Sequence, residues 1–326
     1  MKIGIIGGGK IAERHIHAYK HFQDIELYIS DIDGNIAQNL CNKLNVNFSI
    51  SPEAILGDAT IDIVDVCTPT AHHKEIILEA IKKRKHVFCE KPLCQNLKEA
   101  LEIRKAAEAT DRVVMVGYLY RFHPAFQFVK QVLDEMIIGK PYFSIFRLGG
   151  RGSHREWKHR EAEGGGAIRE MLVHKLDLIL WFFKEIMEIR TLINETLIPL
   201  RKIEGRKIEV NAEDFVVLDL EANNVRILCE SDLVSPCYMD YIEIHGDNGS
   251  IFTSILPYFP TVVYCREPRN IYSEGNNFRN FPSVNLFEKE LSHFLTAIKT
   301  NTKNMNSIEE SVRMFEIIEK IGKPVK

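Results

Sequence analysis

The sequence predicts a doubly wound α/β domain with a parallel sheet, followed by an α+β domain with a large, mostly antiparallel open sheet. Over the first third of the chain, short apolar runs alternate with amphipathic stretches, which is the pattern of consecutive βαβ units. A glycine-rich turn comes directly after the first apolar run. After residue 185, strand patterns follow one another with only turns between them, as in an antiparallel sheet. We therefore expect two domains, at residues 1–120 and 121–326.

The first domain is expected to alternate strands and helices along its whole length. Predicted strands cover residues 2–6, 26–30, 46–49, 62–67, 86–89 and 112–116. Predicted helices cover residues 10–22, 35–44, 72–83 and 97–109. One more short helix is expected, with Ser51 as its cap and with Pro52 and Glu53 in its first turn. Such regular alternation favours right-handed crossovers and a single open sheet.

The second domain begins with a different rhythm. A helix over residues 124–136 precedes a strand at 142–148, a polar, glycine-rich stretch at 149–166 and a long helix at 168–183. Strands are then predicted at residues 188–192, 214–221, 225–231, 240–245, 250–253 and 261–265. Two helices, at 286–299 and 307–321, close the chain. Consecutive strands with helices gathered elsewhere are typical of an α+β domain.

Composition excludes several classes of protein. The net charge of −3 and the absence of a long Lys/Arg block argue against a nucleic-acid-binding protein. No stretch reaches the length of a transmembrane helix, and glycines interrupt the N-terminal apolar run where a secretory signal would need continuity. Seven cysteines without CxxC spacing are typical of reduced thiols. We expect a cytoplasmic protein without membrane or nucleic-acid partners.

The turn after the first strand has the residues of a dinucleotide-binding loop. Residues 7–12 read GGGKIA, which fits GxGxxA between a strand and a helix. Gly7 permits the tight turn, Gly9 lets the backbone approach a pyrophosphate, and a small third residue allows close helix–strand packing. The phosphates would meet free N–H groups at the helix N-terminus, near Lys10 and Ile11. The competing interpretation is an ordinary glycine turn.

Asp31 ends the second predicted strand, about 20 residues after the loop, where an acidic side chain accepts hydrogen bonds from the adenosine ribose. Its carboxylate would repel the 2′-phosphate of NADP, and no arginine follows it immediately. NAD is therefore favoured over NADP. The alternative is that Asp31 simply begins a loop, as aspartate often does.

Four later segments resemble one known family. They are residues 67–73 (CTPTAHH), 86–92 (HVFCEKP), 117–118 (GY) with 121–124 (RFHP), and 164–177 (GGGAIREMLVHKLD). In this order they resemble the Gfo/Idh/MocA oxidoreductases, whose pattern includes a TPxxxH turn, an EKP motif and a GGGxLxDxGxHxxD stretch. The resemblance covers residues 3 to about 185, and the domain order fits to the end.

The resemblance implies a dehydrogenase or reductase that acts on a sugar, a sugar nucleotide or a cyclitol. It implies a Rossmann cofactor domain and a second domain whose open sheet often forms homodimers or homotetramers. It also implies cofactor contacts at the two motifs of the first domain, from Thr68, Pro69, His73, Glu90 and Lys91.

Lys91 is the first candidate for catalysis. It follows a predicted strand at the carboxyl edge of the sheet, where doubly wound folds bind ligands. An ammonium group there can donate a hydrogen bond to the reacting oxygen and stabilise a developing alkoxide. Surface lysines are common, and position alone would make this one a solvated charge. The resemblance favours the catalytic interpretation.

Glu170, His174 and Asp177 are spaced four and three residues apart, so a helix places them on one face. His174 can act as a general acid or base near neutral pH, and Glu170 can orient the substrate or His174. The alternative is a polar stripe without catalytic function. Two departures from the family pattern concern the substrate pocket: Glu170 stands where aspartate is usual, and Leu172 replaces glycine.

Further substrate contacts are expected around this helix. Tyr118, Arg121, Trp157 and Asp177 are the predicted substrate-binding residues. A basic loop at residues 151–160 could clamp an anionic substrate or could be a solvated or subunit-interface loop. The acidic and histidine face of the helix could in principle bind a divalent cation, but no HExxH motif or cysteine pair accompanies it. We expect no metal.

Two other functions remain open. One is a glycosidase that uses bound NAD for a transient oxidation, and the other is a non-catalytic, nucleotide-sensing regulator. Presence of both Lys91 and His174 argues against the regulator, because a sensor needs no proton transfer.

Overall fold

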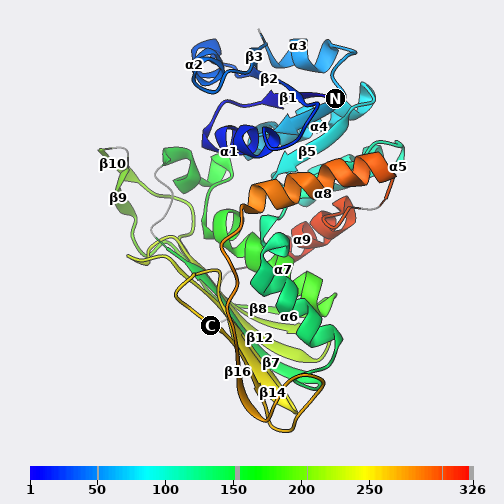
Figure 1. Ribbon diagram of the computed structural model, residues 1–326. Coiled ribbons are helices and arrows are strands. Elements are labelled where there is room, and N and C mark those ends of the chain that lie inside the picture. The colour runs from blue at the N-terminus through cyan, green and yellow to red at the C-terminus, as the bar shows by residue number, and fades with distance from the viewer. Residues whose placement is uncertain (50, 151–154, 204, 303, 323–326) are drawn as a thin grey trace. The chain divides into compact units, whose positions relative to one another are not determined.

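The computed structural model describes residues 1–49, 51–150, 155–203, 205–302 and 304–322. It contains two compact units, and six parallel strands form the central sheet of the first. This first unit contains Met1–Leu119 and Asn285–Phe315, and the second contains Tyr120–Val284 and Glu316–Lys326. Figure 1 shows the course of the chain. The predicted division at residue 120 stays a prediction about domains. The compact first unit differs from it by including helix α8 (Leu286–Thr300), which packs on α1 (Lys10–Tyr19).

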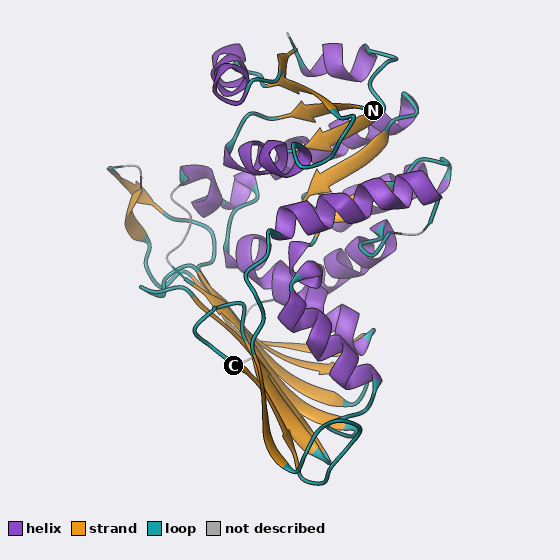
Figure 2. Ribbon diagram, viewed as in Figure 1, coloured by secondary structure: helices purple, strands orange, loops and turns teal. Residues whose placement is uncertain are grey.

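The sheet of the first unit has the strand order β3-β2-β1-β4-β5-β6, which is the order of a Rossmann fold. Its strands are β1 (Lys2–Ile6), β2 (Glu26–Ser30), β3 (Asn47–Phe48), β4 (Ile63–Val66), β5 (His86–Glu90) and β6 (Val114–Gly117). Its connections are α1, α2 (Gly34–Leu44), α3 (Pro52–Gly57), η1 (Thr70–His72), α4 (His73–Lys82) and α5 (Leu97–Glu108), and η2 (Leu119–Phe122) follows the last strand. Figure 2 shows the alternation of helix and strand. The predicted parallel sheet is confirmed.

Local sequence explains where these elements begin. Strand β4 and strand β6 are buried along their whole length, as expected for a parallel sheet covered on both faces. Ser51 accepts a hydrogen bond from the N–H of Ala54 at 3.2 Å and caps α3. Asp33 caps α2 in the same way. Side-chain oxygens at these positions satisfy N–H groups that have no partner within the helix.

The second unit is built on an eight-stranded sheet of order β16-β15-β14-β13-β7-β12-β11-β8. Only β7 and β12 pair in parallel among its described strands. Its strands are β7 (Pro141–Gly149), β8 (Ile186–Glu195), β11 (Phe215–Ala222), β12 (Val225–Asp232), β13 (Met239–Gly246), β14 (Gly249–Thr253), β15 (Thr261–Cys265) and β16 (Gly275–Arg279). The mostly antiparallel sheet is therefore confirmed.

Helices α6 (Pro124–Asp134) and α7 (Val173–Phe183) lie on one face of this sheet (Figure 2). Buried and less buried residues alternate along β11 and β12, as in a sheet with one covered face. A separate hairpin pairs β9 (Leu200–Ile203) with β10 (Arg206–Glu209). The last helix, α9 (Ile308–Lys320), begins in the first unit and ends in the second.

Three features of the second unit differ from the expected elements. Strands β9, β10 and β16 carry few buried side chains, so their apolar pattern is too weak to predict a strand. Short 3₁₀ turns, η3 (Glu156–His159) and η4 (Glu161–Glu163), occupy the glycine-rich stretch. The predicted helix at 168–183 begins as a π-helical turn, η5 (Ile168–Leu172), and becomes α-helical only at Val173.

Candidate active site

In the turn between β1 and α1, Gly7 and Gly9 meet two different structural requirements. Gly7 has φ +103°, and a Cβ atom there would lie 2.7 Å from the backbone of Cys67. Gly9 has φ −77°, and a Cβ there would meet nothing within 4 Å. Gly9 also precedes α1 without any side-chain hydrogen bond to the helix N-terminus. Gly7 is thus required by the fold, whereas Gly9 keeps open space in front of N–H groups that can bind an anion.

Asp31 lies beside this turn, directly after β2. Its Oδ2 accepts a hydrogen bond from the N–H of Gly8 at 2.7 Å, and its Oδ1 accepts one from the N–H of Asp33 at 2.9 Å. The carboxylate is therefore held next to the glycine turn rather than directed into solvent as an ordinary loop residue. This placement matches the position at which an acidic side chain binds the adenosine ribose.

Thr68 adds a polar atom to the same edge of the sheet. It follows β4, and the backbone N of Thr68 lies 3.0 Å from the position of a Cβ on Gly7. Its Oγ1 is buried and has no hydrogen-bond partner among the described residues, although buried hydroxyls normally have one. The open turn, the fixed Asp31 carboxylate and this hydroxyl together fit a dinucleotide. Lys10 and Ile11, also predicted to contact the cofactor, begin α1 at this turn.

Strand β5 ends at Glu90, and Lys91 and Pro92 follow it at the same edge. Oε2 of Glu90 accepts a hydrogen bond from the backbone N–H of Lys91 at 3.2 Å, and the Lys91–Pro92 bond is cis. His73 lies on the other side of this turn, with Nδ1 2.9 Å from the carbonyl oxygen of Pro92 and Nε2 2.9 Å from that of Thr68. Both ring nitrogens of His73 thus face the backbone, and burial lowers its pKa. Cofactor contact by His73, Pro69 and Glu90 stays a prediction.

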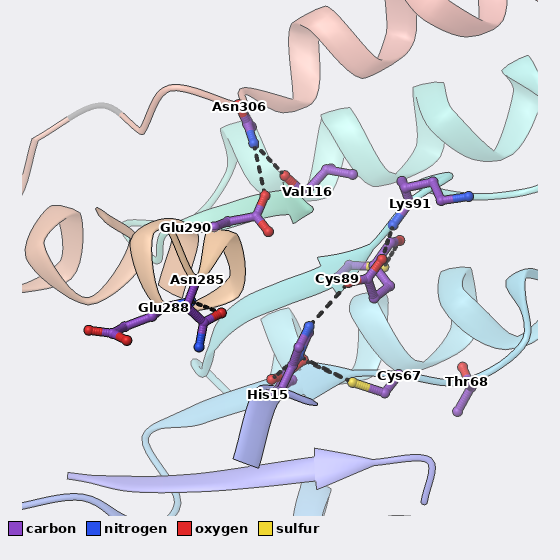
Figure 3. A network of polar contacts seen from close by, with 12 residues as sticks. His15, Cys67, Thr68, Cys89, Lys91, Val116, Asn285, Glu288, Glu290 and Asn306 are labelled. Carbon is purple, nitrogen blue, oxygen red and sulfur yellow. Dashed lines mark hydrogen bonds and ion pairs between the residues drawn. The ribbon is translucent and has the colours of Figure 1, made fainter. Parts of the chain in front are cut away.

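Beneath this turn is a buried group of charged side chains in which His15 is central. Its Nδ1 lies 2.8 Å from Oδ2 of Asp65, and its Nε2 lies 3.1 Å from Oε1 of Glu90. Cys67 Sγ lies 3.4 Å from the same Nδ1. Figure 3 shows His15 reaching from α1 toward Cys67, which directly follows β4, and toward β5, which carries Cys89. Neither His15 nor Asp65 was predicted, because a histidine inside a helix and an aspartate inside a strand carry no motif of their own.

The atoms of His15, Asp65 and Cys67 lie within 4.8 Å of one another and are of metal-ligand type. Hydrogen bonds account for the contacts among these three residues, because both ring nitrogens of His15 face carboxylates. Burial raises the pKa of Cys67 far above its ordinary value, which disfavours the thiolate that a metal requires. The expectation that no metal is bound stays a prediction.

His174 lies on α7 in the second unit and is 9% exposed. Its ring stacks on that of Tyr120, with centroids 4.7 Å apart and planes at 25°. The Tyr120 hydroxyl is 2.6 Å from the hydroxyl of Tyr238, and burial raises the pKa of Tyr120 well above its usual value. Two tyrosines therefore orient the imidazole. Neither tyrosine was predicted: Tyr120 lies between residues 117–118 and residues 121–124, which carry the resemblance, and Tyr238 carries no signal of its own.

The other predicted residues of this helix are paired. Glu170 lies in the π-helical turn and forms an ion pair with Lys158. Asp177 forms an ion pair with Arg121 at 2.7 Å, and both side chains are at most 2% exposed. The structure therefore brings Arg121 and Asp177 together in the interior. Their contact with substrate, like the catalytic use of Glu170, stays a prediction.

The basic loop is partly described. Arg151 and His154 lie outside the described residues. The Lys158 ammonium lies 5.2 Å from the ring centroid of Trp157, and Arg160 pairs with Glu156. Much of the charge of the described part is thus neutralised locally. Tyr118, another predicted substrate contact, is 1% exposed and belongs to the first unit.

Comparisons with known proteins identify relatives over nearly the whole chain. A myo-inositol 2-dehydrogenase of Thermotoga maritima is 27% identical over 311 residues, 95% of this chain and 89% of the relative. An inositol 2-dehydrogenase of Acidothermus cellulolyticus is 30% identical over 263 residues, 77% of this chain and 72% of the relative. A 2,7-anhydro-N-acetylneuraminate hydratase of Escherichia coli K12 is 26% identical over 252 residues, 76% and 66% of the two chains.

The fold is shared with solved structures. A levoglucosan dehydrogenase in complex with NADH superposes with a TM-score of 0.89 at 22% identity, covering 98% of this chain and 95% of the other. Residues 1–118 match the oxidoreductase family with an NAD-binding Rossmann fold, and residues 126–252 match the GFO/IDH/MocA C-terminal domain. The chain therefore belongs to the GFO/IDH/MocA oxidoreductase family, and its cofactor is NAD.

Proposed function

We propose that this protein is an NAD-dependent dehydrogenase or reductase that interconverts a secondary alcohol and a ketone on a sugar, sugar nucleotide or cyclitol. One observation carries the proposal: the edge of the first sheet combines an open glycine turn, a fixed Asp31 carboxylate and the Glu90-Lys91-Pro92 turn. This edge is where doubly wound folds bind their ligands.

The glycine turn and Asp31 serve to bind the cofactor. N–H groups at the start of α1 bind the pyrophosphate, and the Asp31 carboxylate accepts hydrogen bonds from the ribose hydroxyls. The same carboxylate disfavours the 2′-phosphate of NADP. When bound, NAD supplies the two-electron oxidant of the reaction.

Lys91 and His174 act on the substrate oxygen. The Lys91 ammonium donates a hydrogen bond to that oxygen and stabilises negative charge on it. His174, oriented by its stacking on Tyr120, accepts the hydroxyl proton in oxidation and returns it in reduction. Glu170, through its ion pair with Lys158, helps to orient the substrate. Contacts from Tyr118, Arg121, Trp157 and Asp177 complete the proposed substrate site.

The relatives favour a cyclitol as the first substrate to test, because two of them are named inositol dehydrogenases. A second candidate is a reaction without net oxidation, which is supported by the relative named as a hydratase. A hydratase or a glycosidase would use bound NAD for a transient oxidation and return it to its starting state.

Absorbance at 340 nm distinguishes the two candidates. The protein is mixed with NAD or NADP and a panel that contains myo-inositol, levoglucosan, simple sugars and nucleotide sugars. Steady formation of NADH supports the dehydrogenase. Consumption of a panel member, measured by chromatography, without NADH formation supports the second candidate. If no panel member is turned over with NAD or with NADP, and none is consumed, both candidates are contradicted.

Substitution of Lys91 tests its role. Lys91→Ala is expected to remove turnover, because Lys91 acts on the substrate oxygen, and to spare most NADH binding, because the glycine turn and Asp31 still hold the cofactor. Lys98→Ala, at an exposed position seven residues later, is the matched control and should retain turnover. Residual activity of Lys91→Ala above about a tenth of the wild type would contradict the role, since general acid–base groups contribute about 10²–10⁴-fold.

Assembly and location complete the proposal. We infer a homodimer or homotetramer, which light scattering after size-exclusion chromatography would test, and a cytoplasmic location. None of the described helices combines the length and the hydrophobicity needed to cross a lipid bilayer.

A further inference from the structure

His15 connects the helix of the cofactor loop to the turn that carries Lys91. It lies on α1, whose N-terminus faces the glycine turn, and its side chain is 0% exposed. Through Nε2 it contacts Oε1 of Glu90 at 3.1 Å, and Oε2 of the same carboxylate accepts the backbone N–H of Lys91 at 3.2 Å. One buried carboxylate thus spans the distance between the imidazole and the peptide of the proposed catalytic lysine.

The charges around His15 favour its imidazolium form. Asp65 on β4 and Glu90 on β5 each direct one oxygen at a different ring nitrogen, so both nitrogens donate when both carboxylates are ionised. Although burial by itself lowers the pKa of His15, the charge of Asp65 and its hydrogen bond raise that pKa well above its usual value. Burial by itself raises the pKa of Glu90, but its hydrogen bond to His15, together with the charges of His15 and Lys91, lowers that pKa below its usual value.

Aromatic rings complete the enclosure of His15. The ring of Phe88 on β5 meets it edge-on at 5.4 Å, and the ring of Phe287 on α8 lies at 5.5 Å. Neither ring offers a competing donor to the two carboxylates. Removal of the imidazolium would leave Asp65 and Glu90 as two buried carboxylates that share no cation, and one of them would take up a proton. In either case Glu90 would lose the contact that holds its Oε1, and with it the fixed position of the carboxylate next to Lys91.

We propose that His15 is a positioning residue for this enzyme: by holding Glu90 ionised and in place, it fixes the backbone and the electrostatic surroundings of Lys91. His15 touches neither substrate nor cofactor in this proposal and acts only through Glu90. His73 holds the carbonyl oxygen of Pro92 on the other side of the same turn. The inference rests on the proposed role of Lys91, but its central link, from His15 to Lys91, is independent of any substrate.

The direct test of that link is nuclear magnetic resonance of the full chain with reductively ¹³C-methylated lysines. The Lys91 signal is assigned as the one that disappears in Lys91→Arg. His15→Asn is expected to move this signal, whereas His17→Asn should leave it in place. His17 is a matched control because it lies on the same helix with a side chain that is 58% exposed. An unchanged Lys91 signal in His15→Asn would overturn the proposal whether or not a substrate is known.

The second test separates a positioning role from a purely structural one. With an active substrate, His15→Asn is expected to lower kcat about 10- to 100-fold, the usual cost of removing a partner that orients a functional group. Its NADH dissociation constant, measured by fluorescence, should stay within about threefold of wild type, because the glycine turn and Asp31 are unchanged. Equal losses of kcat and NADH affinity would indicate general disruption and would overturn the proposal.

Glu90→Gln provides a second variant of nearly unchanged shape, which keeps the proposal testable if His15→Asn does not fold. It should also move the Lys91 signal and lower kcat. Because both residues act along one path, the double variant should lose little more activity than the more damaged single variant. Full additivity of the two losses would contradict action through Glu90. Absence of turnover in the wild type, with a shifted Lys91 signal in His15→Asn, would instead refute the proposed function alone.

Discussion

Substitution of alanine for two glycines of the same turn should separate folding from cofactor binding. Gly9→Ala introduces a methyl group at φ −77° into space where nothing lies within 4 Å. Alanine adopts this backbone without strain. Relative to wild type, the free energy of unfolding should therefore fall by no more than about 0.5 kcal/mol and rise by no more than about 1 kcal/mol. The methyl group would occupy the approach to the helix N-terminus.

The expected loss of NADH affinity follows from the contacts that this methyl group blocks. A hydrogen bond to a charged group contributes about 1.5–3 kcal/mol, and each 1.4 kcal/mol is about a tenfold change in dissociation constant. Loss of one N–H contact to the pyrophosphate should therefore weaken NADH binding by about 10- to 150-fold. Fluorescence titration with NADH measures this, and thermal unfolding without cofactor measures stability.

Gly7→Ala should have the opposite profile. Its φ of +103° disfavours any side chain, at about 1–2 kcal/mol, and its Cβ would lie 2.7 Å from the Cys67 backbone, adding about 1–3 kcal/mol of overpacking. For a unit of this size, such a loss lowers the melting temperature by about 4–20 °C. A stable Gly7→Ala protein, or a Gly9→Ala protein that binds NADH normally, would refute this account of the turn.

Three further outcomes are expected. Asp240→Asn should destabilise the second unit by about 3–5 kcal/mol in urea unfolding, because it leaves Lys175 buried without its ion pair at 2.6 Å; a loss below about 1 kcal/mol would contradict this. Burial lowers the pKa of His15, but the charge of Asp65 and its hydrogen bond raise that pKa well above its usual value. The stabilisation is therefore complete below the unfolded histidine pKa of about 6.5 and is lost as the pH rises through the folded pKa. His15→Asn should remove this loss of unfolding free energy, which urea unfolding at a series of pH values above about 6.5 measures. Cys237 is exposed, whereas burial raises the pKa of Cys229 to about 12. A thiol reagent should therefore label Cys237 rapidly, and Cys237→Ser should abolish that rapid phase. Labelling of Cys229 should require denaturant.

The first sheet could be predicted from local pattern because each of its elements carries its own signal. Strand β1 and the glycine turn are contiguous in the chain, and Asp31 follows the next strand. Such features depend on near neighbours, so residue order is sufficient to place them on one sheet edge. The same holds for α3, whose cap at Ser51 is readable within three residues.

The parts that could not be predicted depend on distant residues. The π-helical turn that holds Glu170 begins where Glu213 accepts the N–H of Ile168 at 3.0 Å, a contact across 45 residues. Strands β10 and β16 expose most of their side chains and exist because they pair with a neighbour. Neither the side chains of these strands nor a local hydrophobic period predicts such strand pairing.

Residue order by itself determined the parallel first sheet, the antiparallel second sheet and the dinucleotide loop, whereas Lys91 and His174 became candidates through the resemblance to a known family. Only the tertiary structure decided how their surroundings are charged: His15 lies between carboxylates that are 50 and 75 residues away, and Arg121 is buried against Asp177. The reason is physical. Backbone geometry follows from short-range sterics and apolar period, whereas the protonation state of a buried group depends on which charges the fold brings within a few ångströms of it.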